Sequence, residues 1–99
     1  MTVLVIGSVV VQPGRLREAI ALSQEHVKRS RTELGCKSHA VHQDTENPDR
    51  LVFVEQWSDQ AALAQHFKVP ASREFVRALS ALAVGAPSMS IYEAAELNA

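Results

Sequence analysis

The residues of this chain best suited to acid–base chemistry gather around one apolar segment. Glu55 and Trp57 close an apolar run, and His66 follows in the next predicted helix. Histidine is the natural proton acceptor near neutral pH, because its unperturbed pKa is about 6.5. We take His66 as the first candidate for a catalytic base, with an exposed helix histidine as the alternative. A junction of a strand and a helix with such residues is typical of the mouth of a small-molecule pocket.

A second histidine could join Glu55 across a hairpin. His39 and His42 have opposite parity on their predicted strand, so only one of them can share a sheet face with Glu55. If Gln43 pairs with Leu51, then His39 lies opposite Glu55. A carboxylate beside an imidazole makes the ring more basic. We take His39 as the second catalytic candidate, and a polar cross-strand pair without a chemical role is the alternative.

The same strand offers candidate binding residues. Trp57 could form a flat wall for an aromatic ring, or fill the core. Glu55 could orient a base, or serve as an ion pair or helix cap. Tyr92, on the last predicted strand, could donate a hydrogen bond to a substrate oxygen or reach a partner chain, and packing is its alternative role. The predicted substrate-binding residues are Trp57, Glu55, Phe53, Phe67 and Tyr92.

The motifs predict no cofactor and no metal site. The four histidines stand at positions 26, 39, 42 and 66, and no two have the i, i+4 spacing that places two ligands on one helix face. The four glycines, at positions 7, 14, 35 and 85, never cluster into a phosphate-binding loop. The single cysteine, Cys36, has only Lys37 nearby to activate its thiol, so we expect a buried and inert side chain.

Length and charge indicate one globular domain that covers residues 1–99. Hydrophobic residues make up 46% of the chain and charged residues 21%, as in ordinary soluble proteins. The net charge of −1, with acids interleaved among the basic residues of 15–33, excludes the electrostatic footprint of a nucleic-acid-binding protein. The apolar start is too short to span a membrane. One cysteine fits a reducing compartment, so a cytoplasmic protein is expected.

Periodicity and chain breakers divide the sequence into strands and helices. Gly35 is expected to be the left-handed stop of the first helix, just after Leu34 on its apolar stripe. Pro70 should end or re-aim the second helix. The predicted strands cover residues 2–11, 36–44, 50–58 and 88–96, and the predicted helices cover residues 15–34, the segment from Ser58 or Asp59 to Pro70, and residues 72–83.

This order, β-α-β-β-α-β, predicts an α+β fold of the ferredoxin-like type with an antiparallel sheet. In that fold the first and third strands are central, and here they are the two most apolar strands. The helices cover one face of the sheet, yet the first strand is apolar on both faces. A second copy of the sheet is the simplest cover for the other face, so we expect a homodimer.

The ordered set of motifs resembles the antibiotic biosynthesis monooxygenase domain family, part of the dimeric α+β barrel superfamily. The resemblance covers nearly the whole chain. It is carried by Gly35-Cys36 after the first helix, Asn47-Pro48-Asp49-Arg50 in the hairpin, Glu55-Gln56-Trp57, Ala61-Ala62-Leu63, His66, and the stretch from Pro70 to Phe75.

The resemblance implies a cofactor-independent monooxygenase that acts on a small aromatic, phenolic or quinol-like compound. In such a reaction the enzyme removes a substrate proton and the electron-rich anion then reacts with dioxygen. Two alternatives stay open. One is a non-catalytic dimeric module that binds a small molecule or has a stress-related role, and the other is a small-metabolite isomerase of the same superfamily.

The chain departs from the family pattern at several positions. The family often has a second histidine just after the helix-breaking proline, where this chain has Ala71. It often has a tyrosine in the second strand, where this chain has His39. Haem-degrading relatives use an asparagine and a histidine at positions that match Gly7 and Leu79 here, and neither of these can serve as an axial ligand. Haem degradation is therefore not expected.

Overall fold

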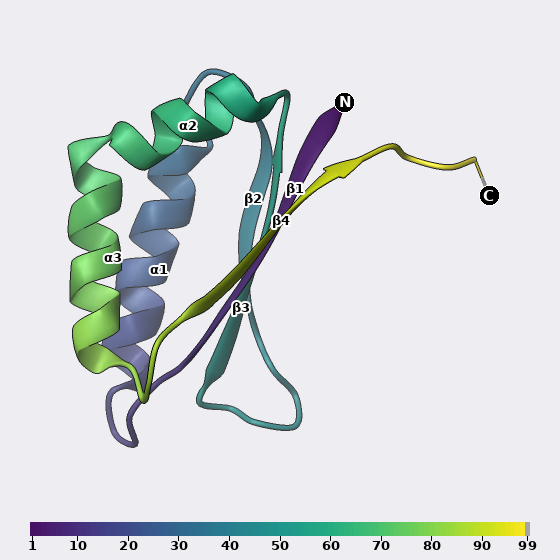
Figure 1. The fold of residues 1–99 in the computed structure, drawn as a ribbon. Helices are drawn as coiled ribbons and strands as arrows, with labels where there is room; N and C mark the ends of the chain where they lie inside the picture. The colour runs from purple at the N-terminus through teal and green to yellow at the C-terminus, as the bar shows by residue number, and fades with distance from the viewer. Residues whose placement is uncertain (99) are drawn as a thin grey trace.

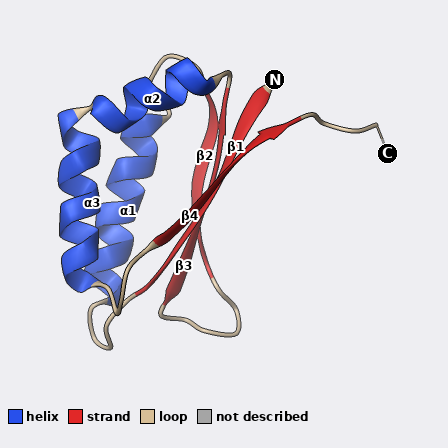
Figure 2. Cartoon of the chain, in the orientation of Figure 1, coloured by secondary structure: helices blue, strands red, loops and turns tan. Residues whose placement is uncertain are grey.

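Four strands form one antiparallel sheet, and three helices pack on a single face of it (Figures 1 and 2). The computed structural model describes residues 1–98. The α+β, ferredoxin-like prediction is confirmed. In chain order the elements are β1 (Thr2–Val10), α1 (Leu16–Ser30), β2 (Cys36–Gln43), β3 (Arg50–Trp57), α2 (Gln60–Lys68), α3 (Pro70–Leu82) and β4 (Ser88–Ala94).

The sheet has the strand order β2-β3-β1-β4, so the apolar strands β1 and β3 are central as predicted. The β2–β3 hairpin pairs Gln43 with Leu51 and therefore His39 with Glu55. The register that would bring His39 to Glu55 is thus confirmed, and His42 falls on the opposite face. On β3 the side chains of Leu51, Phe53, Glu55 and Trp57 all face the helices and are buried.

The first helix is shorter than predicted, because it ends at Ser30 and not at residue 34. The hydroxyls of Ser30 and Thr32 donate to the carbonyls of His26 and Arg29, which satisfies groups at the helix end locally. Leu34 lies in the following turn and is 94% exposed. Gly35 does adopt a positive φ of 85°, but it lies in the turn just before β2, five residues beyond the end of the helix, and does not stop it.

The junction of α2 and α3 re-aims the chain at Pro70, as expected. Asp59 is the N-cap of α2, and its carboxylate accepts a hydrogen bond from the Ala62 N–H at 2.8 Å. Val69 is extended, and α3 then begins with proline at its first position. This geometry places the last turn of α2, which carries His66, over the sheet.

The core lies between the sheet and the helices in two adjoining clusters. The larger cluster packs α1 and α3 on the sheet, and the smaller one surrounds the indole of Trp57 beneath α2. Within residues 1–98, the opposite face of the sheet carries no helix (Figure 1). In the part of the chain that the structure describes, no helix combines the length and apolar character needed to cross a membrane.

Candidate active site

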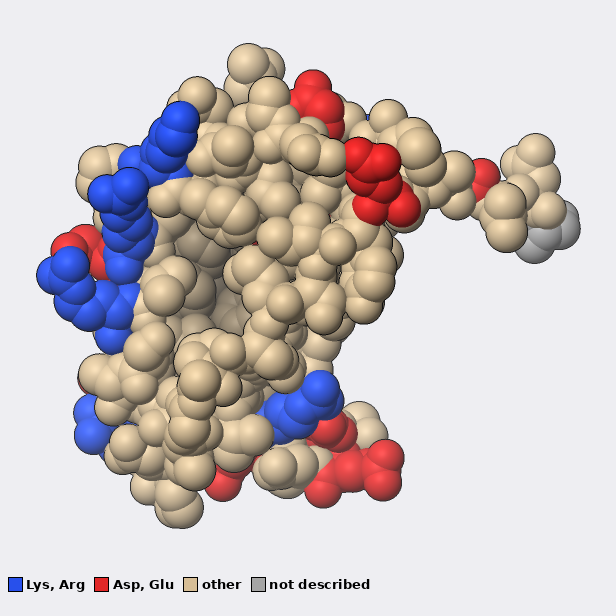
Figure 3. All heavy atoms as spheres, in the orientation of Figure 1, with Lys and Arg blue, Asp and Glu red and all other residues tan. Residues whose placement is uncertain are grey.

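A cavity of about 490 Å³ opens between the sheet and the helices. Figure 3 shows it as a hollow in one face of the molecule, with the charged side chains mostly at the periphery. Its volume falls within the range of about 300–1,000 Å³ that is usual for small-molecule sites. Its titratable lining comprises Glu55 of β3, His26 of α1, His66 of α2 and Arg73 of α3. The other polar lining residues are Ser8, Ser72, Ser80 and Ser88, and the apolar lining includes Val9, Phe53, Phe67, Phe75, Leu79 and Met89.

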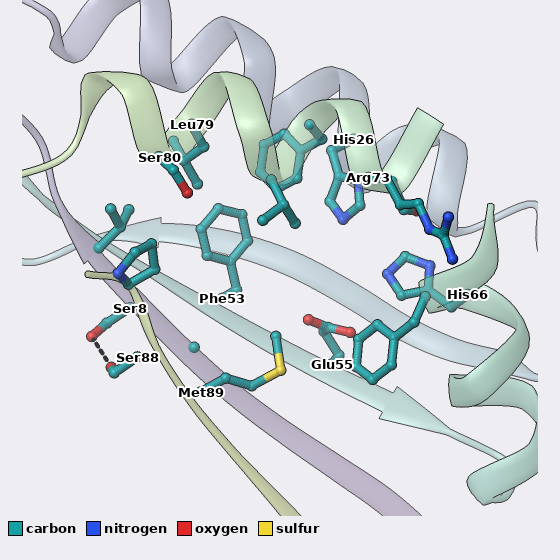
Figure 4. A pocket seen from close by; sticks show the side chains of 17 residues that line it. Ser8, His26, Phe53, Glu55, His66, Arg73, Leu79, Ser80, Ser88 and Met89 are labelled. Atoms are coloured by element: carbon teal, nitrogen blue, oxygen red, sulfur yellow. Dashed lines mark hydrogen bonds between the residues drawn. The ribbon is translucent and has the colours of Figure 1, made fainter. Parts of the chain in front are cut away.

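Glu55 and Trp57 act as a unit because alternate residues of a strand share a face. The Nε1–H of Trp57 donates to the Oε1 atom of Glu55 at 2.9 Å. Burial by itself raises the pKa of Glu55, but His39 and the Trp57 N–H outweigh burial and hold the pKa below its ordinary value. Glu55 is therefore a fixed, ionised carboxylate at the inner end of the cavity (Figure 4).

His66 lies at the cavity wall and is held by a second acid. Its Nδ1 atom is 2.8 Å from the Oε1 atom of Glu33, and the imidazole is buried. An ionised carboxylate can only accept, so Nδ1–H is the donor and the neutral ring has its lone pair on Nε2. The ring of His66 also lies on the indole of Trp57, with centroids 4.6 Å apart. Both contacts fix the orientation of the ring.

His26 belongs to the site, although it was not among the predicted site residues. It faces the cavity from α1 (Figure 4) and stacks on Phe75, with centroids 4.0 Å apart and planes inclined by 6°. Arg29 Nη2 is 2.7 Å from its Nδ1 atom, and a guanidinium only donates, so Nδ1 accepts. The sequence did hold a signal, because His26 continues the buried stripe of Ser23, Val27 and Ser30 at helical spacing.

Burial, followed by the charges of the neighbouring histidines and Arg29, lowers the pKa of His26 to about 3. A ring with so low a pKa is a poor proton acceptor at neutral pH. Glu55 is a weak base for the same reason, because its pKa is also lowered. Arg73, which also lines the cavity, can only donate. Among Glu55, His26 and His66, His66 is therefore the group best suited to accept a proton from a bound molecule.

His39 lies behind this wall and does not line the cavity. Its Nε2 atom is 3.3 Å from Glu55 Oε1, and its ring meets those of His26 and His66 with centroids 5.2 and 5.7 Å apart. The cross-strand neighbour of Glu55 is thus present as expected. Because His39 is 1% exposed, it can influence a bound molecule only through Glu55 and the other histidines.

The remaining predicted residues fall into three places. Phe53 forms the floor of the cavity and Phe67 part of its rim. Trp57 was expected to be either a wall of the pocket or a core residue, and it is a core residue: it is fully buried, and its N–H holds Glu55. Tyr92 is half exposed and pairs with Leu4, a neighbour on the outer face of the sheet, so it lies outside this cavity.

Burial and the nearby acids raise the pKa of the Cys36 thiol, consistent with an inert side chain.

Sequence comparison places these residues in a family. The profile described as antibiotic biosynthesis monooxygenase matches residues 2–78. The chain belongs to this family. A relative, the uncharacterized protein sll1783 of Synechocystis sp., is 36% identical over 94 residues, which is 95% of this chain and 64% of the relative. The chain therefore spans less than two thirds of that protein.

Solved structures share the fold of this family member. A conserved protein from Methanosarcina mazei Go1 is 27% identical, with a TM-score of 0.89 over 93% of this chain and 91% of the other. An antibiotic biosynthesis monooxygenase is 24% identical, with a TM-score of 0.88 over 95% and 99%. Rv0793 from Mycobacterium tuberculosis is 19% identical, with a TM-score of 0.91 over the whole of both chains. The last two similarities concern the fold alone.

Proposed function

We propose that this member of the antibiotic biosynthesis monooxygenase family is a cofactor-independent monooxygenase of a small phenolic or quinol-like compound. Family membership supports the reaction class. The observation that carries the proposal is a buried histidine, His66, held by Glu33 at the wall of an apolar cavity. Proton removal inside such a cavity yields an electron-rich anion that is shielded from water.

His66 is the proposed base and Glu33 its positioning residue. The carboxylate holds Nδ1–H, so the Nε2 lone pair is free to take the hydroxyl proton of a substrate. As the ring becomes an imidazolium, the negative charge of Glu33 stabilises it, as the acid does in other acid–histidine pairs. Glu55 keeps its own negative charge and accepts the N–H of Trp57, which leaves His66 as the proton acceptor.

The reaction balances without an added reductant. A phenol loses its hydroxyl proton to His66, and the resulting anion delivers electrons to dioxygen. One oxygen atom bonds to the ring carbon opposite the hydroxyl, the hydrogen of that carbon is lost, and the ring becomes a quinone. The second oxygen atom leaves as water, which takes up the two hydrogens. The substrate supplies all four electrons, so the protein contributes only the base and the cavity.

The active form proposed is a homodimer in which two sheets pack on each other. The outer face of β1 and β3 carries Leu4, Ile6, Val52 and Val54, and none of these meets a helix. Ile6 is 42% exposed in the single chain. A second copy of the sheet would remove this apolar surface from water.

The decisive experiment measures oxygen consumption with a panel of one- and two-ring phenols and hydroquinones. We expect turnover with at least one compound. His66→Gln should lower kcat by about 100-fold or more, because it removes the base. Glu33→Gln should lower kcat by roughly 10-fold or more with little change in KM, because it keeps an acceptor for Nδ1–H but loses the charge.

Glu25→Gln is the matched control for Glu33→Gln. Glu25 is an exposed acid of α1, so its change should leave kcat within about 2-fold of the native value. No oxygen uptake above background with any compound would contradict the oxygenase proposal. Turnover unchanged in His66→Gln would instead contradict the assignment of the base.

A non-catalytic binding module is the second candidate, and Ala71 favours it. The family often has a second histidine at this position, and a methyl group cannot replace its proton chemistry. This candidate predicts saturable binding of a ring compound, seen by quenching of the Trp57 fluorescence, with no oxygen consumption. Binding without turnover would therefore decide between the two candidates.

A further inference from the structure

Three histidines from three separate elements meet at the inner end of the cavity. They are His26 of α1, His39 of β2 and His66 of α2, and all three are buried. Their ring centroids are 5.2, 5.2 and 5.7 Å apart in the three pairs. One ring nitrogen from each of the three lies within 4.8 Å of the others.

We propose that His26, His39 and His66 bind a divalent transition-metal ion, with Zn²⁺ as the reference ion. Neutral imidazole nitrogens are the usual protein ligands of zinc, copper, nickel and iron. Nitrogens bound to one tetrahedral Zn²⁺ at about 2.0–2.1 Å lie roughly 3.3 Å apart. Because the three nitrogens lie within 4.8 Å of one another, each pair must close by at most about 1.5 Å to reach this geometry.

The environment of His39 is the independent observation that calls for a ligand. His39 is 1% exposed, and its Nδ1 atom has no hydrogen-bond partner among residues 1–98. Its Nε2 atom faces the Glu55 carboxylate at 3.3 Å, so Nδ1 is the nitrogen that lacks a partner. Buried polar atoms are rarely left without a partner, and a bound ion would supply one.

Glu33 and Glu55 each lie beside one ring nitrogen of a candidate ligand, as carboxylates often do at metal-binding histidines. Glu33 accepts from Nδ1 of His66, which leaves Nε2 as the ligand atom. Glu55 faces one nitrogen of His39, which leaves the other available. A carboxylate on the far nitrogen orients a metal-binding imidazole and makes it a stronger ligand. Because His26, His66 and Glu55 also line the cavity, a bound ion would keep a coordination position open to it.

Arg29 opposes the metal-bound state in the present arrangement. It donates to Nδ1 of His26 and to the hydroxyl of Ser72, at 2.7 and 3.1 Å. A metal on either nitrogen of His26 requires this guanidinium to leave, since Nδ1 must then bind the ion or carry a proton. Arg29 is therefore the residue that the ion must displace.

The site does not depend on the oxygenase proposal, but it constrains that proposal. An ion bound to His66 occupies the Nε2 lone pair that serves as the base. Metal binding and base catalysis at His66 are therefore mutually exclusive, and a stoichiometric amount of Zn²⁺ should inhibit turnover.

The test is titration of the chelator-treated native protein with Co²⁺, followed by displacement with Zn²⁺. We expect saturation at one ion per chain, with the visible absorption bands of nitrogen-ligated Co²⁺. His39→Gln and His66→Gln should weaken binding by about 100-fold or more. His42→Gln is the matched control, because His42 lies three residues from His39 along β2, on the opposite and exposed face of the strand. This variant should bind Co²⁺ as the native protein does.

Arg29→Gln should have the opposite effect on the affinity for Co²⁺. It removes the competing positive charge and supplies a carbonyl that can accept from Nδ1–H of His26, so it should tighten Co²⁺ binding by about 10-fold. Circular dichroism of each variant verifies that it is folded. The absence of saturable binding by the native protein would overturn the proposal, and so would an equal loss of affinity in His42→Gln and His39→Gln. Oxygen uptake by the chelator-treated protein is measured separately, so a failure of either proposal is distinguishable from a failure of the other.

Discussion

The three clustered histidines are the same residue type in three electrostatic settings. Arg29 makes His26 an acceptor at Nδ1, whereas Glu33 makes His66 a donor at the same atom. His39 faces the Glu55 carboxylate with Nε2, and its Nδ1 atom has no partner among residues 1–98. The partner of each ring, and not the histidine itself, therefore decides whether it can accept a proton or bind an ion. Arg29 lies one helical turn from His26, but Glu33 and Glu55 are distant in the chain from the histidines that they contact, so spacing along the sequence could not have assigned the roles of His39 and His66.

Acid stability should depend on His26. Its pKa falls from 6.5 to about 3 on folding, so below pH 6.5 the unfolded chain binds a proton that the folded chain does not. The contribution of His26 to the free energy of unfolding is therefore fully present above pH 6.5. It is lost as the pH falls toward 3, by up to about 1.4 kcal/mol per pH unit. Urea unfolding at pH 7 and at pH 5 should differ by roughly 2 kcal/mol from this source.

His26→Gln should make the free energy of unfolding less dependent on pH in this window, whatever its stability at pH 7. Glu55 also has a lowered pKa, but its contribution is lost only below its ordinary value of 4.5, so the window above pH 5 isolates the histidine. His42→Gln removes an exposed histidine and should keep the native slope. If the free energy of unfolding of His26→Gln depended on pH as that of the native protein does, then other groups would dominate the loss of stability in acid.

At the scale of elements, the alternation of side chains along the strands predicted the positions of site residues best. Parity and the hairpin turn predicted that His39 would face Glu55, because both elements are local and regular. The approach of α1 to β2 was not predictable in this way, since nothing in the period of a helix fixes its height over a sheet. His26 was missed for that reason, and Leu34 was placed on the helix although the helix ends before it.

Gly7 of the central strand β1 should control the space available to a ring. It lines the cavity beside Phe53, and an added Cβ atom would meet the Ser88 carbonyl oxygen at 3.4 Å and Phe53 Cβ at 3.9 Å. Alanine is thus tolerated, and Gly7→Val should project methyl groups into the cavity. We expect KM for the best substrate of the panel to rise slightly in Gly7→Ala and by about 10-fold in Gly7→Val.

The melting temperature separates cavity filling from misfolding. Gly→Ala in a strand removes the entropy cost of glycine, about 0.5–1 kcal/mol, so Gly7→Ala should not lower stability. Ile6→Val changes the neighbouring residue on the opposite face and should leave KM unchanged. An unaltered KM in Gly7→Val would mean that the substrate does not reach the β1 side of the cavity.

At the scale of the whole molecule, the arrangement is one-sided. All three helices cover one face of the sheet (Figure 2), where they build the cavity and the histidine cluster. The other face leaves Ile6 and Tyr92 42% and 51% exposed, with apolar neighbours on both central strands. The sequence predicted this imbalance, because the first strand is apolar at both parities. It could not predict the cavity, which depends on how far α3 stands from the sheet.

The proposed dimer follows from that imbalance, and one charge should break it. The native protein should sediment at twice the chain mass at micromolar concentration. Ile6 lies at the centre of the outer face, opposite Val54, so Ile6→Lys would bury an unpaired ammonium in the interface. A loss of about 3–5 kcal/mol is usual for an uncompensated buried charge, which corresponds to more than about 100-fold in the dissociation constant. Val84→Lys is the control, because Val84 is exposed in the loop after α3. A native protein that sediments as a monomer, or an equal effect of the two lysines, would contradict a dimer built through this face.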